Sequence, residues 1–206
     1  MPWATMLLPA SAVALSLILA SPDATYGRIE GDLAVRGAAG VTFGPRAPRG
    51  TVDLRLRYLQ SAGFFTTYEE GFGTSSPTRA LAFGFEVKPL FLGRWLRGLE
   101  FGSAYPDLLL DSFGLELGVV LSQPAGGAFA DRYGMQFGVA LEVPLFPRSS
   151  GLFVGVHGGL RWSRATLGGT EPAAPDDRSL YLTVVLAWQQ IFGGAAFADA
   201  GDKPLR

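Results

Sequence analysis

The residues best suited to acid–base chemistry are His157, the single histidine of the chain, and Glu142. Both lie in segments where large apolar residues alternate with small or polar ones, and both belong to the second set. If these segments are neighbouring strands joined by a turn at 147–150, the two side chains lie diagonally near each other on one face. A histidine beside a carboxylate suggests a general base. No serine follows His157 at short spacing, so we expect a satisfied interior histidine.

Other patterns offer little support for chemistry. Asp131, Glu171, Asp176 and Asp177 supply oxygen ligands, but without the spacing of a metal loop. The segment GFGTSS, residues 71–76, lacks the lysine of a phosphate-binding loop. The absence of cysteine excludes disulfides, thiolate metal sites and cysteine nucleophiles. We therefore predict no catalytic residue, no metal site and no cofactor.

Composition is unusual for a soluble α/β enzyme. Charged residues make up 17% of the 206 residues, and 28 are glycine, about twice ordinary usage. The formal net charge of −1 provides no basic surface for nucleic acid. The length suits one domain.

The N-terminus carries an apolar run from Met6 to Ala20, followed by small residues to Ala24. The run covers about 22 Å as a helix, less than the roughly 30 Å of a bilayer core. We therefore predict a signal peptide over residues 1–24, although the first basic residue is Arg28. A short anchor or a misassigned start codon are the alternatives. No later run reaches the length of a membrane helix, so further membrane association would need strands.

Strict alternation of apolar and polar residues recurs along the chain, as in TVDLRLRY at residues 51–58. It predicts strands of about 10 to 14 residues, suited to tilted membrane-spanning strands. Seven are clear, and an eighth, over 64–70, alternates poorly but makes the count even. The seven cover residues 28–43, 51–58, 79–88, 112–122, 132–143, 151–163 and 179–192. The predicted fold is all-β: a single up-and-down antiparallel β-barrel of eight strands.

The predicted connections sort by length. Those at 59–63 and 147–150 are short, whereas four others are longer and rich in turn residues: 44–50, 71–78, 122–131 and 164–177. The long connection over 89–111 is the exception, because it falls at the short-turn end. Its apolar residues have helical spacing, which predicts a short helical insertion near 92–110. This helix could lie on a membrane surface or pack across the barrel mouth.

One strand face is rich in large apolar residues, and the other combines glycine, alanine and charges. Glycine is unfavourable in a water-facing strand but makes room for long side chains inside a narrow barrel. We therefore expect Leu54 and Leu56 to face lipid and the charged face to form an interior polar network. Six acidic and six basic residues balance there, as confined charges require. The predicted network is Glu30, Asp32, Arg36, Asp53, Arg55, Arg57, Glu86, Lys88, Glu116, Arg132, Glu142, His157 and Arg161.

Aromatic residues on the apolar face fall near strand ends and predict two lipid-interface girdles. Phe43, Tyr133 and Trp162 map to the rim with the longer loops. Tyr58, Trp188 and Phe192 map to the rim with the short turns.

From about Tyr26 to Phe192 the chain resembles the small eight-stranded outer-membrane barrels of the OmpA/OmpX type. The segment LYLTVVLAWQQIF, residues 180–192, is similar to their last strand, which alternates and ends in an aromatic residue. Here 14 residues follow Phe192, a departure from the terminal position. The resemblance implies a transmembrane barrel over 25–193, a short tail over 194–206 and a bacterial outer-membrane location.

Three functional hypotheses follow. The first is an outer-membrane barrel with a filled, charge-paired interior and a structural or surface-interaction role, not an open pore; its partners are outer-membrane lipid and a surface ligand at the long loops. The second is a soluble periplasmic barrel that holds a small lipophile among Leu54, Phe83, Phe137 and Val184. The third is a lipid-modifying barrel enzyme that uses His157. The sequence does not give the oligomeric state.

Overall fold

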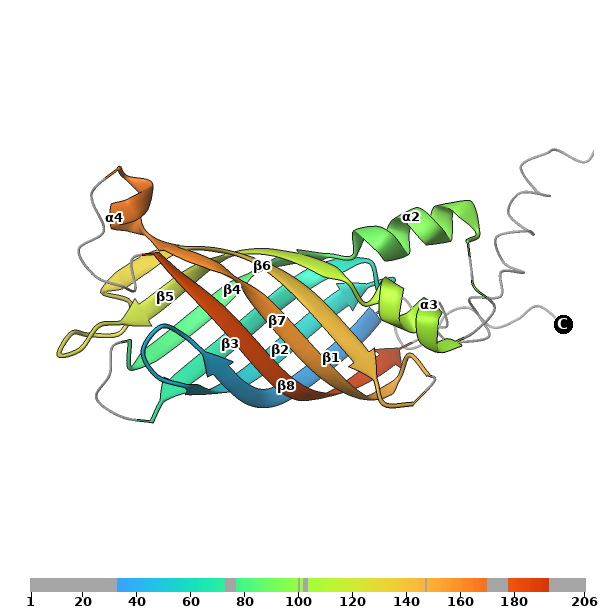
Figure 1. Cartoon of the computed structure of the whole chain (residues 1–206), viewed down its shortest axis with the longest axis horizontal. Coiled ribbons are helices and arrows are strands. Elements are labelled where there is room, and N and C mark those ends of the chain that lie inside the picture. Colours follow the sequence, from blue (N-terminus) through green and yellow to red (C-terminus); the bar gives the residue numbers. More distant parts are fainter. Residues whose placement is uncertain are drawn as a thin grey trace, which may run out of the picture.

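The chain forms a closed barrel of eight antiparallel strands, in which each strand pairs with its neighbours in the sequence and β8 closes on β1 (Figure 1). This computed structural model describes residues 33–72, 77–99, 101, 104–146, 148–169 and 178–192. The strands are β1 (Leu33–Phe43), β2 (Arg49–Tyr58), β3 (Ala62–Gly71), β4 (Arg79–Val87), β5 (Gly114–Gln123), β6 (Arg132–Pro144), β7 (Gly151–Ser163) and β8 (Arg178–Phe192). The predicted fold class, an eight-stranded up-and-down barrel, is confirmed.

The strand with poor alternation is a full member of the barrel. As β3, it pairs along its whole length with β2 and with β4. The strand β2 begins at Arg49, two residues before the predicted start at Thr51. The predicted signal peptide over 1–24, the start of the first predicted strand and the tail over 194–206 lie outside the described residues.

The two ends of the barrel differ. At one end, which we call the long-loop rim, lie the connections β1–β2, β3–β4, β5–β6 and β7–β8, with α4 (Arg164–Leu167) among them (Figure 1). At the other end, the short-turn rim, β2 and β3 are joined by a tight turn in which the Ser61 amide donates to the Tyr58 carbonyl. Leu59 and Gln60 adopt positive φ there, as a two-residue hairpin turn of type I′ requires.

Charged side chains fill the inside of the barrel and apolar side chains cover its outside. In β2, Leu54 and Leu56 are 50% and 41% exposed, whereas Asp53, Arg55 and Arg57 are buried in the lumen. The same arrangement holds for Phe85, Leu117 and Leu186 on other strands, all more than half exposed. The protein therefore has an ionic core and an apolar surface, the reverse of an ordinary globular domain.

Two helices close the short-turn mouth. α2 (Pro89–Arg97) and α3 (Ala104–Asp111) follow β4 and pack on each other, and α3 packs on β6. Phe91 and Leu108 are buried against the interior ends of the strands, beside Lys88 and Glu142. The predicted helical insertion is confirmed, and Phe91 and Leu108 pack at the barrel mouth. Leu90 and Leu96 of α2 are exposed, and contact of this helix with a membrane surface stays a prediction.

An ion-pair cluster holds the two helices together. The Arg94 guanidinium pairs with the Asp107 carboxylate and lies 2.6 Å from Asp111 Oδ1. The Asp107 carboxylate also accepts from the Phe101 amide at 3.0 Å. Neither helix, nor any other helix among the described residues, has the length and apolar content needed to cross a bilayer.

Candidate functional site

The interior contains one continuous ion-pair network, which we call the central network. Alternation in β1, β2, β4, β5 and β6 directs seven of its side chains into the same space, and Lys88 joins them from the position after β4. It joins four carboxylates to four cations, so that its formal charge is zero: Asp53, Glu86, Glu116 and Glu142 with Arg36, Arg55, Arg57 and Lys88. All eight side chains are buried. Such charges are tolerated away from water only when each is paired.

Arg55 contacts three of these carboxylates. Its Nε lies 2.8 Å from Asp53 Oδ1, its Nη1 lies 2.6 Å from Glu116 Oε1, and its guanidinium also bonds Glu86. The five donors of a guanidinium suit such multiple pairing. Asp53 in turn accepts from the Thr67 hydroxyl at 2.8 Å. Arg55 thus links β2 to β4 and β5 across the lumen.

Glu142, in turn, contacts three of the four cations. Its carboxylate bonds Arg57, lies 2.8 Å from Arg36 Nη1 and accepts from Lys88 Nζ at 3.1 Å. Lys88 follows Val87, the last residue of β4, and lies at the short-turn mouth. Burial and the nearby Arg57 lower the pKa of the Lys88 ammonium to about 8, against the opposing pull of Glu142.

His157 lies in the lumen, where its carboxylate partner differs from the one predicted. The residue pairs in register with Ala140, so Glu142 is diagonal to it as expected, but its Nδ1 lies 2.8 Å from Glu116 Oε1. The same nitrogen lies 3.0 Å from Arg55 Nη2. Protonated Nδ1 donates to Glu116, whereas bare Nδ1 accepts from Arg55. The ring is therefore held within the network, and no described serine hydroxyl bonds to it.

A second cluster lies toward the long-loop rim. Glu69 accepts from Arg49 Nε at 2.8 Å and from Arg161 Nη2 at 2.6 Å. The Arg161 guanidinium also lies 4.3 Å from the centre of the Tyr181 ring, and its Nε donates to Gln136 at 3.1 Å. Sequence reasoning missed Glu69 and Arg49. Glu69 and Glu70 are adjacent in the poorly alternating strand, and Arg49 was assigned to a loop.

Glycines in the strands give the long side chains their room. A Cβ at Gly138 would lie 2.3 Å from the Tyr181 hydroxyl, and one at Gly155 would lie 2.5 Å from Arg36 Nη2. Both distances are far below van der Waals contact. The glycine content of the inner face therefore has a steric cause, as its distribution in the sequence suggested.

The remaining predicted network residues have different locations. Glu30 and Asp32 lie outside the described residues. Arg132 is half-buried and lines a pocket at the long-loop rim. Arg36, Asp53, Arg55, Arg57, Glu86, Lys88, Glu116, Glu142, His157 and Arg161 are all buried.

The aromatic residues proposed as girdles occupy the two ends of the outer face. Tyr58 and Phe192 both pair in register with Leu33 at the short-turn rim, where Trp188 is also exposed. At the other end, Phe43 and Tyr133 are exposed and Trp162 is half-buried. Whether these rings meet a lipid interface stays a prediction.

The packed lumen leaves little space for a ligand or a stream of ions. A void of about 10 Å³ lies among Asp53, Arg55, Glu116, His157 and their neighbours, about the room that one water needs. Within the part of the chain that the structure describes, no three histidine or carboxylate side chains are placed to hold a metal ion. Of the acidic residues considered for metal binding, Asp131 caps its own loop by accepting from the Ala128 amide, and Glu171, Asp176 and Asp177 lie outside the described residues.

The interior also decides against the lipophile-binding hypothesis. That hypothesis places four apolar side chains around a cavity, but all four point out of the barrel and are exposed: Leu54, Phe83, Phe137 and Val184. The prediction that they line an interior cavity is therefore wrong. The inner positions next to these four residues are occupied instead by charged, polar or small side chains, such as Asp53, Ala82, Gln136 and Thr183, which are buried.

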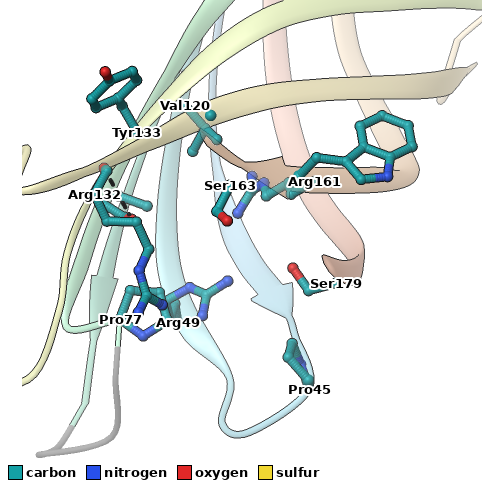
Figure 2. Close-up of a pocket in the computed structure, with 13 residues that line it drawn as sticks. Pro45, Arg49, Pro77, Val120, Arg132, Tyr133, Arg161, Ser163 and Ser179 are labelled. Atoms are coloured by element: carbon teal, nitrogen blue, oxygen red, sulfur yellow. Dashed lines mark hydrogen bonds between the residues drawn. The ribbon is translucent and has the colours of Figure 1, made fainter. Parts of the chain in front are cut away.

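The mouth at the long-loop rim contains a shallow pocket with three arginines, shown in Figure 2. Arg49 comes from β2 and Arg132 from β6, and Arg161, Ser163 and Ser179 of β7 and β8 also line the pocket (Figure 2). The Tyr133 ring lies on the other side of β6 from Arg132 (Figure 2). Inside the barrel, the Glu69 carboxylate forms ion pairs with two of these arginines, Arg49 and Arg161.

Fold and interior together define a closed β-barrel with a filled, ion-paired lumen. No protein-family model matches the chain, and no curated protein matches it. Among solved structures, it is similar to the solution NMR structure of the de novo designed TMB2.3, at 11% identity and a TM-score of 0.39. That match covers 77% of this chain and 93% of the designed chain.

Proposed function

We propose that this protein is a bacterial outer-membrane β-barrel of the small OmpA/OmpX-like type, with a structural or surface-interaction role. The observation that supports it best is the reversed distribution of side chains. Leucine and phenylalanine cover the outer face of the barrel, while arginine and glutamate fill the lumen. A soluble monomer rarely exposes a continuous apolar surface of this kind, and a membrane barrel requires one.

The height of the apolar band agrees with this proposal. In β8 the outward residues from Leu180 to Trp188 are all apolar and exposed. At about 3.4 Å per residue they span roughly 27 Å along the strand. A tilt of about 40° reduces this to roughly 21 Å along the barrel axis, close to the ~25 Å band of outer-membrane barrels.

The filled lumen favours a role other than conduction. A pore needs a continuous water path, whereas the central network joins opposite walls of this barrel and α2 and α3 cover one mouth. Binding is therefore assigned to the long-loop rim, where loops are carried by a rigid scaffold.

Cell fractionation tests this proposal. We expect the full-length protein, expressed in a Gram-negative host, to sediment with the outer membrane and to leave it only in detergent. We also expect the unboiled protein to migrate differently from the boiled protein on a gel, because the closed barrel resists unfolding by detergent. Release of the protein by osmotic shock in soluble form would instead support a periplasmic barrel and would refute the membrane assignment.

A further inference from the structure

Charged residues on the outer face are confined to one rim. Among the described outward-facing strand positions, the charged side chains are Glu70, Arg79 and Arg178, and all three lie at the long-loop rim. Arg164 adds a fourth charge, immediately after β7. The rest of the outward-facing strand surface carries apolar, small or neutral polar residues. The charges thus lie where the headgroups of one membrane leaflet would lie if the apolar band spans the membrane.

On the β3–β4 side of this rim, the charge is neutralised within the protein. Arg79 Nε lies 3.0 Å from Glu70 Oε1, and the Tyr68 hydroxyl bonds the same carboxylate. This arrangement leaves no net charge for a ligand to recognise. The neutral β3–β4 side can therefore be compared with the arginines on the opposite side of the same rim.

On the β6–β8 side of this rim, Arg178 and Arg164 each lie beside an aromatic residue. Trp162 pairs in register with Arg178, and the Arg164 guanidinium lies 5.4 Å from the centre of the Tyr133 ring. We call these four residues the arginine–aromatic patch. Among the described residues, no acidic side chain forms an ion pair with either arginine. Asp176 and Asp177, which precede Arg178 in the sequence, lie outside the described residues.

The chemistry of the patch suits a phosphate group attached to an acyl chain. A guanidinium offers parallel N–H donors that match two phosphate oxygens, and stacking on a ring leaves those donors free at its edge. Directly below the patch, toward the middle of the barrel, lie the exposed side chains of Leu180 and Met135. An adjacent apolar surface would hold the chain of a lipid whose headgroup binds the arginines.

We propose that the arginine–aromatic patch binds the phosphorylated headgroup of an anionic lipid. The proposal rests on the membrane location proposed above and names the lipid chemistry that this rim selects. Near a membrane surface, each arginine adds about 1 kcal/mol of attraction for anionic lipid, which corresponds to about five-fold in affinity. Removal of both is expected to weaken binding by about 25-fold.

The test is lipid binding to the full-length protein in detergent, measured by native mass spectrometry. Wild type is titrated with phosphatidic acid, which carries a phosphate monoester, and with phosphatidylcholine, whose phosphate is masked by choline. We expect preferential binding of phosphatidic acid, and its loss in an Arg164→Gln/Arg178→Gln variant. Both arginines are exposed, so this variant should fold, and its heat-modified mobility on a gel checks that it does.

Two controls separate the possible outcomes. Arg79→Gln removes an arginine from the same rim that is already paired, and should leave phosphatidic acid binding within about two-fold. Inorganic phosphate should not displace the lipid, because the apolar surface below the patch contributes to binding. Equal binding of the two lipids, an unaffected double variant, or full displacement by inorganic phosphate would each overturn the proposal. Lipid binding is measured in detergent, whereas cell fractionation tests the membrane location. A patch that does not bind lipid can therefore be told apart from a protein that is not in the outer membrane.

Discussion

At the scale of single residues, the chain keeps ionised groups in its interior by pairing each with at least one group of opposite charge, and most with several. Arg55 bonds Asp53, Glu86 and Glu116, and Glu142 receives Arg36, Arg57 and Lys88. Loss of one member of such a network leaves its partners buried without compensation, which typically costs about 3–5 kcal/mol.

Replacement of Arg55 by leucine tests this dependence. Three carboxylates would lose a partner, so we expect Arg55→Leu to lower the free energy of unfolding by about 3–5 kcal/mol. Urea unfolding of the barrel in lipid vesicles measures the change. Arg79→Gln, which disrupts an exposed pair, should cost no more than about 1 kcal/mol. Similar losses for the two variants would contradict a network-stabilised lumen.

The lowered pKa of Lys88 predicts a dependence of stability on pH. The pKa of Lys88 is about 8 in the folded barrel and about 10.4 in an unfolded chain. Between these values the unfolded state binds more protons, so the free energy of unfolding rises as pH increases through this window. The rise approaches roughly 3 kcal/mol at 1.36 kcal/mol per pKa unit.

The matched variant for this effect is Lys88→Met. It keeps the length of the side chain but removes the titrating group, and Glu142 retains Arg36 and Arg57. The difference in unfolding free energy between wild type and variant should therefore change between about pH 8 and about pH 10.4. A difference that stays constant over this range would show that burial does not perturb Lys88.

At the scale of elements, alternation in the sequence predicted which residues face inward, but not which of them meet. Parity assigns a side chain to a face, whereas a contact across the lumen depends on the height and angle of two strands far apart in the sequence. His157 thus bonds Glu116 of β5, not Glu142 of the adjacent strand β6. For the same reason, the pairing of Glu69 with Arg161 could not be predicted.

The least predictable strand was β3, for a local reason. Phe64 and Phe65 are adjacent, yet Phe64 is 59% exposed and Phe65 is buried. Glu69 and Glu70 divide in the same way, since Glu69 joins the interior and Glu70 pairs with Arg79 outside. With the same residue type on both faces, the sequence contains no alternation to detect.

Close approach of neighbouring strands gives glycine a second role in these elements. A Cβ at Gly84 would lie 2.1 Å from the Leu117 carbonyl oxygen and 2.4 Å from the Gly118 Cα, and backbone atoms cannot move aside. We expect Gly84→Ala to destabilise the barrel by at least about 1–3 kcal/mol in urea unfolding.

Gly93→Ala is the control for this substitution. A Cβ at Gly93 meets no atom within 4 Å, and alanine is favoured over glycine inside a helix by about 1 kcal/mol. This variant should be at least as stable as wild type. Equal stability of Gly84→Ala and Gly93→Ala would show that the strands do not approach as closely as described.

At the scale of the whole molecule, the lumen and the helical cap would block conduction independently. The cap places Phe91 and Leu108 over one mouth, and the central network lies beneath it. We expect wild-type protein to produce no conductance steps in a planar lipid bilayer. A variant in which a short turn replaces residues 89–111 should also produce none, because the ion pairs below the cap remain. Regular steps in wild type would contradict a filled interior.

The most direct test of the whole account is the environment of the outer face. The chain has no cysteine, so single-cysteine variants can be labelled without background. Leu117→Cys changes an outward residue in the apolar band, and Ala128→Cys changes an exposed residue of the β5–β6 loop. In intact outer-membrane vesicles, a water-soluble maleimide should label the Ala128→Cys variant and not the Leu117→Cys variant, which only a lipid-soluble maleimide should reach. Equal labelling of both variants by the water-soluble reagent would show that the apolar face meets water and would contradict the account.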